Sequence, residues 1–435
     1  MSRLLEFIVN FIVNKIILWP FYLPIIFLLK EVKCTPLVKN NGITILAINP
    51  DRFRDGELES LARSGFSVLL MPYQWQTRVF YAYKDRSSKE QFKNPPENSS
   101  IYIDRIRLRR YLSYLLKAIY LKKNINCVIG AGLFYNQDFD WGAVSTSIGT
   151  PYIVLHRENL VLTKHIHEAT VYRAKSLRDT GFFGTSIVFH NKIMKNIYDK
   201  YSGISTNDIY ALGSLRMDKY LNDIKGKKNK MNNNCITLFS FNVTNSLRGY
   251  MGIENDFGWH KLHNDVHTSF VDLAIKNPKI NFIIKHKGVK WSETESLLKS
   301  INALNLVNLK ICGESFNAQE LILKSDVVTG FCSTTLLEAS VAGKPVIYPL
   351  FGEAQDESYK DFLCFENELD MFDVATSKDE YKDLLIKKMK QPKVSQEKMK
   401  LRRLNFDKYV SLLDSSAVKK HTELIINEVK KISIS

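Results

Sequence analysis

Ser325–Pro349 reads SDVVTGFCSTTLLEASVAGKPVIYP and is the stretch that decides the fold. An apolar run ends at Gly330, hydroxyl residues follow, and a helical pattern then carries Glu338 and stops before Gly343. Pro345 opens a second apolar run, so the stretch predicts strand, polar turn, helix and strand. This is one βαβ unit, and ligands of such folds bind where the first strand ends.

The turn of this unit carries groups that suit a nucleotide. Backbone N–H groups and the hydroxyls of Ser333, Thr334 and Thr335 lie at a helix N-terminus, which favours a phosphate. Glu338, one turn later, could accept hydrogen bonds from a ribose. A structural interpretation stays open, in which a hydroxyl caps the helix and Glu338 completes a capping box.

The order of these residues resembles the donor-binding segment of GT-B glycosyltransferases. The hydroxyl cluster is followed by Glu-Ala at 338–339 and by Gly-Lys-Pro-Val-Ile at 343–347. The pattern is most similar to bacterial enzymes that build surface and capsular polysaccharides. Nucleotide-sugar epimerases of the same fold share much of it, and over the rest of the chain the resemblance is one of layout.

Bulk composition predicts two globular domains. The chain has 435 residues, which is too many for a single hydrophobic core, and 45% of them are hydrophobic. Six scattered cysteines without a CxxC pair argue against a zinc site or a disulfide framework. The formal charge of +16 favours polyanionic partners. We expect no nucleic-acid partner, because the lysines are spread over many helices and no recognised nucleic-acid motif is present.

Residues 1–33 are predicted to form an apolar helix that lies in a membrane interface. The uninterrupted apolar part, Ile16–Leu29, is shorter than the ~20 residues of a membrane span. Glu6, Asn10 and Asn14 share one helical face, and apolar residues occupy the other. We therefore expect a peripheral or monotopic protein at the cytoplasmic face of the inner membrane. The alternative is a helix that packs on the protein itself or on a partner subunit.

From Gly42 onward, strand-like runs alternate with helical patterns, which predicts parallel sheets built from βαβ units. The predicted fold is α/β, with two Rossmann-like domains facing a cleft as in GT-B enzymes. We assign an N-terminal acceptor domain, a basic linker, a donor-binding domain and helices that cross back, at 42–222, 223–235, 236–400 and 401–435. Strands are expected at 43–48, 66–71, 127–130, 152–155, 187–190 and 209–212, then at 236–241, 281–285, 309–312, 326–329 and 346–350.

A cationic cluster ends the second predicted strand of the donor domain. Lys285, His286 and Lys287 suit a negatively charged phosphate, although a solvated loop is the plain alternative. In bacterial GT-B sialyltransferases, which this site resembles, a His-Pro pair here contacts CMP, whereas this chain has Lys287 after His286. The resemblance implies a CMP-linked acidic sugar of the Kdo or sialic-acid type. The expected donor-binding set is Lys285, His286, Lys287, Gly330, Ser333, Thr334, Thr335, Glu338, Ser240 and Ser214.

The candidates for catalysis follow the strand predicted at 152–155. An inverting transfer needs a base near the acceptor hydroxyl. A retaining transfer needs a carboxylate nucleophile or support for an ion-pair-like transition state. Glu158 is the first candidate and His156 the second, while an Arg157–Glu158 pair that steadies the loop is the structural alternative.

No metal and no cofactor are expected, and the nucleotide-sugar is a substrate. His165 and His167 form an HxH pair without a third nearby ligand. Asp138 and Asp140 match the short DxD pattern, which we interpret as a surface loop. Cationic side chains and helix ends can stabilise a leaving phosphate without a metal.

The sequence thus predicts a metal-independent glycosyltransferase that moves a sugar from a nucleotide-activated donor to a surface polysaccharide or glycolipid. Three alternatives remain: a CDP-glycerol-type glycerophosphotransferase, a nucleotide-sugar epimerase of the same fold, and a non-catalytic glycan-binding assembly subunit. Stereochemistry and oligomeric state are left open.

Overall fold

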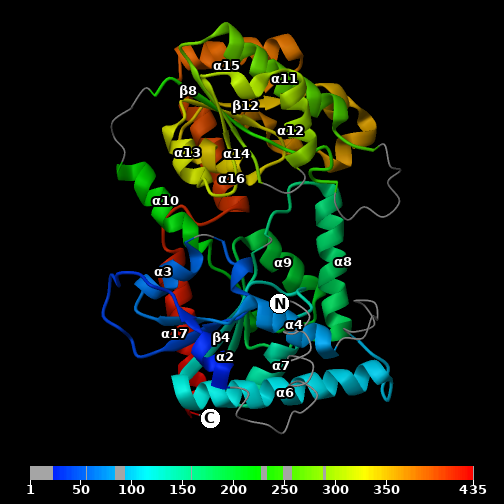
Figure 1. Cartoon of the computed structure of the whole chain (residues 1–435), viewed down its shortest axis with the longest axis vertical. Coiled ribbons are helices and arrows are strands. Elements are labelled where there is room, and N and C mark those ends of the chain that lie inside the picture. The colour runs from blue at the N-terminus through cyan, green and yellow to red at the C-terminus, as the bar shows by residue number, and fades with distance from the viewer. Residues whose placement is uncertain are drawn as a thin grey trace. The chain divides into compact units, whose positions relative to one another are not determined.

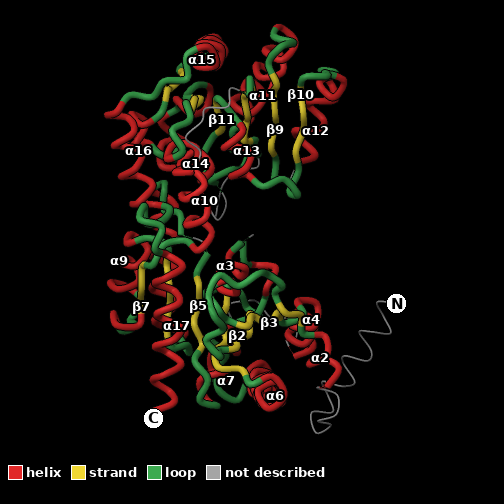
Figure 2. The backbone as a smooth tube through the Cα atoms, turned by 90° about the vertical axis from the view of Figure 1, so that its left-hand side faces the viewer, coloured by secondary structure: helices red, strands yellow, loops and turns green. Residues whose placement is uncertain are grey.

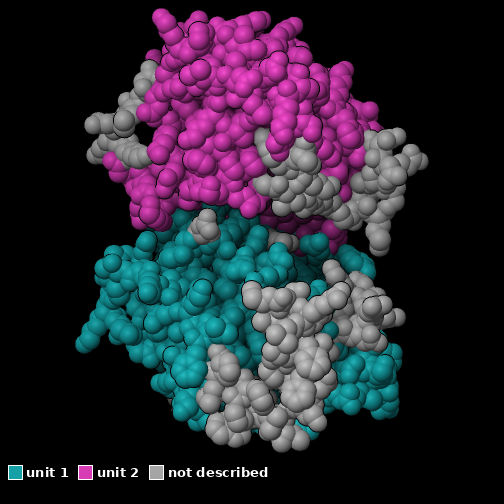
Figure 3. Space-filling model, in the orientation of Figure 1, with its two compact units in different colours: residues 1–159, 171–218, 414–435 teal, residues 160–170, 219–413 magenta. Residues whose placement is uncertain are grey.

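The chain forms two compact units, each built around one sheet. The computed structural model describes residues 23–54, 56–83, 94–157, 159–226, 233–247, 257–287 and 291–434. Unit 1 comprises residues 1–159, 171–218 and 414–435, and unit 2 comprises residues 160–170 and 219–413 (Figure 3). Both units are α/β with mainly parallel sheets, which confirms the predicted fold class.

Unit 1 has a seven-stranded sheet with the order β1-β3-β2-β4-β5-β6-β7. Strands β2 to β7 are parallel, and β1 joins β3 in antiparallel fashion. The strands are β1 (Lys30–Glu31), β2 (Thr44–Ala47), β3 (Ser67–Leu70), β4 (Ile125–Gly130), β5 (Tyr152–Leu155), β6 (Ser186–Phe189) and β7 (Ile209–Ala211). Its helices include α2 (Leu23–Leu28), α3 (Glu57–Arg63), α4 (Tyr73–Tyr83), α6 (Ser100–Lys123), α7 (Phe139–Ser147), α9 (Lys192–Tyr201) and α17 (Ala417–Ile434).

Unit 2 has a six-stranded parallel sheet with the order β10-β9-β8-β11-β12-β13. The strands are β8 (Cys235–Phe239), β9 (Asn281–Lys285), β10 (Leu309–Cys312), β11 (Val327–Gly330), β12 (Val346–Pro349) and β13 (Asp373–Ala375). The helices include α11 (His260–Lys276), α12 (Trp291–Ser300), α13 (Ala318–Lys324), α14 (Thr334–Val341), α15 (Lys378–Lys390) and α16 (Gln396–Tyr409). Helices α8 (Lys164–Thr180) and α10 (Leu215–Gly226) have residues in both units.

The central strands are apolar along their whole length because helices cover both faces of each sheet (Figures 1 and 2). Every residue of β5, β6, β8, β11 and β12 is buried. This burial made the strands readable as continuous apolar runs, and each of the eleven predicted strands is found within one or two residues of its expected place. The short edge strands β1 and β13 were not predicted.

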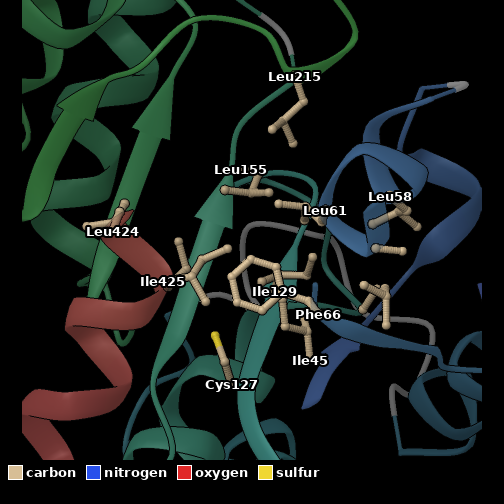
Figure 4. Packing of buried hydrophobic residues seen from close by; sticks show 14 of the residues in the cluster. Ile45, Leu58, Leu61, Phe66, Cys127, Ile129, Leu155, Leu215, Leu424 and Ile425 are labelled. Atoms are coloured by element: carbon tan, nitrogen blue, oxygen red, sulfur yellow. The ribbon is translucent and has the colours of Figure 1, made fainter. Parts of the chain in front are cut away.

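The C-terminal helix α17 completes the core of unit 1. Leu424 and Ile425 pack with Cys127 and Ile129 of β4 and with Leu61 of α3 (Figure 4). The helix begins where the carboxylate of Asp218 accepts hydrogen bonds from the N–H groups of residues 417 and 418, at 3.2 and 2.8 Å. A buried carboxylate at a helix N-terminus compensates the unpaired N–H groups there.

Two stretches lie in a different unit from the domain to which they were assigned. Residues 160–170 belong to unit 2, where Lys164 pairs with Asp361 and the ring of His165 lies 5.0 Å from that of Phe362. Residues 401–413 also belong to unit 2, since buried Arg402 donates to backbone carbonyls of residues 371 and 344. The expected linker, 223–235, is helical at its start because α10 continues to Gly226.

The interfacial helix predicted for residues 1–33 falls mostly outside the described residues. Within them, the prediction is wrong at its end, because Lys30 and Glu31 pair with Leu70 and Leu69 as an edge strand. Pro24 lies in the first turn of α2, where a proline costs no helical hydrogen bond. No helix among the described residues is both long and apolar enough to cross a membrane.

Gly330 sets how closely β8 and β11 approach. An added Cβ at this position would lie 2.9 Å from the carbonyl oxygen of Phe239 and 3.3 Å from Leu336 Cδ2. The first contact is with backbone of the paired strand, so it cannot be relieved by a side-chain rotation. A side chain here would push the two central strands apart.

Gly330→Ala is therefore expected to lower the free energy of unfolding by about 1–3 kcal/mol through overpacking. Gly226→Ala is the matched control, because a Cβ there meets nothing within 4 Å and the site lies at a helix end. Urea unfolding of both variants measures the difference. Equal stability of the two variants would contradict this role for Gly330.

Candidate functional site

The strand order of unit 2 places a ligand site between β8 and β11. The chain runs from β8 to β9 and β10 on one side, and then returns to β11 on the other side of β8. Loops after neighbouring strands diverge at such a reversal and leave a crevice at the carboxyl ends of the strands. The predicted donor residues Ser240, Lys285–Lys287 and Gly330–Thr335 all follow β8, β9 and β11, three adjacent strands.

Asn245 fastens the two loops that border this position. Its side-chain Nδ2 donates to the carbonyls of Phe331 and Cys332, at 3.1 and 3.0 Å. The Nε1–H group of Trp259 in turn donates to the carbonyl of Asn245 at 2.7 Å. The indole is fully buried against Phe331, so Trp259 supports the loops by packing and offers no surface to a ligand.

Ser240 is the polar side chain at the end of β8, and its hydrogen bonds determine what it can bind. Its Oγ lies 2.8 Å from His267 Nε2, and His267 Nδ1 lies 2.7 Å from the carbonyl oxygen of His263. Burial lowers the pKa of His267 to about 3, so the ring is neutral. A carbonyl only accepts, hence Nδ1 carries the proton and Nε2 accepts the proton of Ser240.

The backbone N–H of Ser240 is also engaged, because it donates to the carbonyl of Lys285 at 2.9 Å. Ser240 thus turns only oxygen lone pairs toward a ligand. It can accept a hydrogen bond from a sugar or ribose hydroxyl, whereas it has no proton to donate to a phosphate oxygen. The donor contact of Ser240 stays a prediction, and its hydrogen bonds favour a ligand hydroxyl over a phosphate oxygen.

Lys285 and His286 join the loops that follow β9 and β10. The Lys285 ammonium donates to the carbonyls of His286 and Gly313, each at 2.8 Å, so two of its three N–H groups are used internally. Burial lowers the pKa of Lys285, and burial followed by the nearby ammonium lowers the pKa of His286. Lys287 is exposed. The third N–H of the Lys285 ammonium is not used by these two carbonyls, and the half-buried imidazole of His286 lies next to the ammonium.

The hydroxyl cluster forms the N-terminus of α14. Ser333 is the N-cap, and its Oγ lies 2.8 Å from Thr335 Oγ1 and 3.4 Å from the Thr335 backbone nitrogen. Cys332 precedes it with a left-handed φ of 46°. This conformation turns the chain sharply from β11 into the helix, and the N-terminus of α14 then points to the carboxyl edge of the sheet. Thr334, at the first helical position, is half-buried.

Glu338 lies one turn into α14 and is buried. Its backbone carbonyl accepts a hydrogen bond from the Tyr220 hydroxyl at 2.8 Å. The N-cap is Ser333, and Glu338 lies five residues beyond it, whereas a capping box needs the third residue after the cap. Glu338 is therefore not a capping-box partner of this helix.

Unit 1 carries the residues assigned to the acceptor. His156 follows β5 and is buried, with its ring 5.4 Å from the ring of Phe189 and 6.3 Å from that of Phe134. Its Nδ1 accepts a hydrogen bond from the N–H of Leu133 at 3.4 Å. Glu158 lies outside the described residues. Ser214, which was assigned to the donor set, is buried between β7 and α10 and belongs to unit 1, whereas the other donor candidates belong to unit 2.

A buried polar network marks the strand reversal of unit 1, which lies between β2 and β4. The two carboxylate oxygens of Asp138 accept from Asn49 Nδ2 at 3.2 Å and from Gln76 Nε2 at 2.8 Å. The N–H of Asn49 donates to Gln76 Oε1 at 2.7 Å, which fixes the Gln76 amide. The network thus ties the segments after β2, β3 and β4 together.

The surface-loop interpretation of Asp138 and Asp140 is wrong, because both side chains are buried. Asp138 immediately precedes α7, and Asp140 lies in its first turn. Asp140 Oδ1 accepts from Arg105 Nε at 2.9 Å and from Arg109 Nε at 2.6 Å. The two carboxylates serve separate networks, so the DxD pattern here reflects packing of α7 against α6 and the sheet.

The described residues hold no group of three or more His, Cys, Asp and Glu side chains that could bind a metal. His165 and His167 begin α8, and the His165 ring packs near Phe362.

Comparison with known proteins rests on structure, since no family model and no curated protein matches the sequence. The chain is similar to UDP-GlcNAc 2-epimerase from Neisseria meningitidis bound to UDP-GlcNAc, with a TM-score of 0.50 and 12% identity over 88% of this chain and 99% of that chain. A putative UDP-N-acetylglucosamine 2-epimerase from Listeria monocytogenes gives 0.53 and 12%, over 91% and 98%. An α,α-trehalose-phosphate synthase (UDP-forming) from Burkholderia vietnamiensis gives 0.50 and 9%, over 90% and 98%.

The chain has the fold of the GT-B enzymes. Identities of 12% and below establish the architecture alone. In this fold, the strand reversals of both Rossmann-like units are where the chain's own polar groups converge, which agrees with the positions of Ser240 in unit 2 and Asp138 in unit 1.

Sequence reasoning missed the residues that organise both reversals. Asn245, His267, Asn49 and Gln76 act through contacts with residues far along the chain, so no local motif marks them. Asp138 did carry a signal, since it stands directly before an apolar helical stretch.

Asp138 makes unfolding pH-dependent. Burial raises its pKa to about 7, against hydrogen bonds from Asn49 and Gln76 that lower it. The unfolded value is about 4. The folded state therefore binds this proton more tightly than the unfolded state does, and the resulting stabilisation is complete below pH ~4. The stabilisation decreases as the pH rises and is lost once the pH passes ~7.

Asp138→Asn removes this titration and keeps the shape of the side chain. Relative to Asp138→Asn, the wild type is expected to lose about 2–3 kcal/mol of unfolding free energy between pH 5 and pH 8. Urea unfolding at the two pH values measures it. Asp383→Asn, an exposed aspartate of α15, is the control and should follow the wild type. Parallel pH curves for wild type and Asp138→Asn would contradict the shift.

Proposed function

We propose that this chain is a glycosyltransferase that takes a sugar from a nucleotide-activated donor. The observation that carries the proposal is the convergence of Ser240, His286 and the capped N-terminus of α14 at the strand reversal of unit 2. The helix N-terminus and the cations of the β9 loop suit the phosphates. The lone pairs of Ser240 suit a hydroxyl of the ribose or the sugar.

The acceptor is proposed to bind unit 1, as a surface polysaccharide or glycolipid. Glu158 or His156 then acts as the base, because His156 directly follows β5 and Glu158 comes two residues later in the sequence. His156 would do so only through a ring that is buried among Phe134 and Phe189. This burial favours Glu158 as the first residue to test.

The identity of the donor nucleotide is the more specific part of the proposal. The resemblance of His286 and the hydroxyl cluster to sialyltransferase motifs supports a CMP-linked acidic sugar. The fold neighbours favour UDP, since the Neisseria enzyme is bound to UDP-GlcNAc and the trehalose-phosphate synthase is UDP-forming. CMP and UDP would both place a phosphate and a ribose at the same edge of the sheet, so only contacts with the nucleobase can distinguish the two nucleotides.

A nucleotide-sugar epimerase is the second candidate, and the two epimerase structures of the same fold favour it. An epimerase acts on a free nucleotide-sugar and has no use for a lipid-linked acceptor. The apolar sequence at residues 1–33 favours the transferase.

The nucleotide is tested by thermal unfolding in the presence of CMP, CDP, UDP and GDP. A nucleotide at 100 times its Kd adds about 2.7 kcal/mol and raises Tm by a few degrees. Stabilisation by CMP or CDP supports the CMP-linked donor, and stabilisation by UDP alone would replace it with a UDP-sugar. No response to any of the four would contradict the nucleotide site. Conversion of UDP-GlcNAc without acceptor and without release of UDP would indicate the epimerase.

Ser240→Ala tests the geometry of the site. The variant should weaken binding of the stabilising nucleotide or its sugar conjugate about tenfold, the effect of one lost hydrogen bond of ~1.4 kcal/mol. Titration calorimetry measures the affinity. Ser300→Ala, an exposed serine of α12, is the matched control. Unchanged affinity in Ser240→Ala would place the ligand elsewhere.

A further inference from the structure

Helix α6 carries apolar side chains on two opposite faces. The inner face is buried and includes Leu108, Leu112, Leu115 and Ile119. A soluble surface helix normally turns charged and polar residues to the other side. Here the outer face instead exposes further large apolar side chains, and Leu121 among them is 80% exposed.

The outer residues form one continuous stripe. Their spacing of three and four keeps them on a single helical face. It contains both apolar and cationic side chains, and it contains no carboxylate. Its members are Ile103, Ile106, Arg107, Arg110, Tyr114, Lys117 and Leu121, and we call them the α6 stripe. The one acidic residue of the helix, Asp104, lies at the border and pairs with Arg107 at 3.3 Å.

Helix α2 adds apolar surface beside α6. The two helices are in contact, and Figure 1 shows α2 against the long α6 at the edge of unit 1. Ile25 and Ile26 of α2 are buried, whereas Phe27 is 83% exposed and Leu28 is also exposed. The apolar sequence of residues 1–22 leads directly into this helix. The exposed apolar residues of α2 therefore belong to a helix that contacts α6.

We propose that the α6 stripe docks unit 1 on an anionic lipid surface. The 24-residue helix is about 36 Å long and can lie flat along the membrane. Arg107, Arg110 and Lys117 then face lipid headgroups, with their aliphatic stems along the apolar boundary. Ile103, Ile106 and Leu121 enter the boundary itself. Tyr114 suits the headgroup level, where its ring and hydroxyl meet different surroundings.

Charge complementarity decides for lipid over a protein partner. A stripe that mixes cations with large apolar groups and contains no carboxylate of its own fits a surface that offers anions and hydrocarbon everywhere along its length. The chain's formal charge of +16 adds long-range attraction to the same surface. The proposal goes beyond the glycosyltransferase assignment and does not require it, although a glycolipid acceptor would give the docking a purpose.

The cationic part is tested with the full chain and sedimented vesicles of phosphatidylcholine alone or with phosphatidylglycerol. Neutralising three residues should weaken partition onto the anionic vesicles about 100-fold, at ~1 kcal/mol for each cation near the surface. The variant is Arg107→Gln/Arg110→Gln/Lys117→Gln. The control removes the same charge from exposed lysines of unit 2, as Lys276→Gln/Lys387→Gln/Lys390→Gln, and should change partition by less than about threefold.

The apolar part is tested in the same assay. Serine substitution in the stripe should weaken binding about tenfold or more, on anionic and neutral vesicles alike, since buried apolar area is lost. The variant is Ile103→Ser/Ile106→Ser/Leu121→Ser. The control replaces three exposed apolar residues of unit 2, as Ile275→Ser/Leu304→Ser/Val307→Ser, and should bind as the wild type does.

Three outcomes would overturn the proposal. The wild type could ignore anionic vesicles, which would point to a protein partner for the stripe. The stripe variant could bind as well as the wild type, which would leave the N-terminal residues alone as the anchor. The stripe and control variants could lose binding equally, which would reduce the effect to net charge. Thermal unfolding with the stabilising nucleotide, unchanged in the stripe variants, separates this result from a failure of the donor site.

Discussion

The close approach of β8 and β11 at Phe239 and Gly330 is the constraint on which the rest of unit 2 depends. Without a side chain at Gly330, the first and fourth strands of the unit can pair directly, and the chain reverses its direction of strand addition between them. The loops that leave this point are held by Asn245, which donates to the backbone of residues 331 and 332. This contact fixes the loop after β8 to the loop after β11.

The two units use the same topological device with different chemistry. At the reversal of unit 2, buried histidines are neutral because burial lowers the pKa of His263 to about 4 and that of His267 to about 3. They orient a serine without adding charge. At the reversal of unit 1, Asp138 is buried among amides, and its pKa is raised to about 7 by that burial. The strand reversal of unit 2 thus carries neutral hydrogen-bonding groups, whereas the equivalent reversal of unit 1 carries a carboxylate that titrates.

Much of the fold was readable because burial on both faces leaves its mark on every residue of a strand. The runs at 152–155 and 281–285 coincide with β5 and β9 for that reason. The errors arose where a residue's role depends on distant contacts. Asp138 looked like a polar loop residue, yet Asn49 and Gln76 satisfy it inside the protein. The donor contact of Lys285 stays a prediction, and only the structure shows that two N–H groups of its ammonium bond to carbonyls of two neighbouring loops.

The sequence by itself determined the alternation of strands and helices, the βαβ unit at residues 325–349, and the grouping of hydroxyls and cations after particular strands. These features are local, since apolar periodicity and turn residues act over a few neighbours. Only the tertiary structure decided which groups remain available to a ligand. Ser240 can only accept a hydrogen bond from a ligand, because its hydroxyl donates its own proton to His267 on another element. The α6 stripe became visible because packing fixed which of the two apolar faces of the helix is buried.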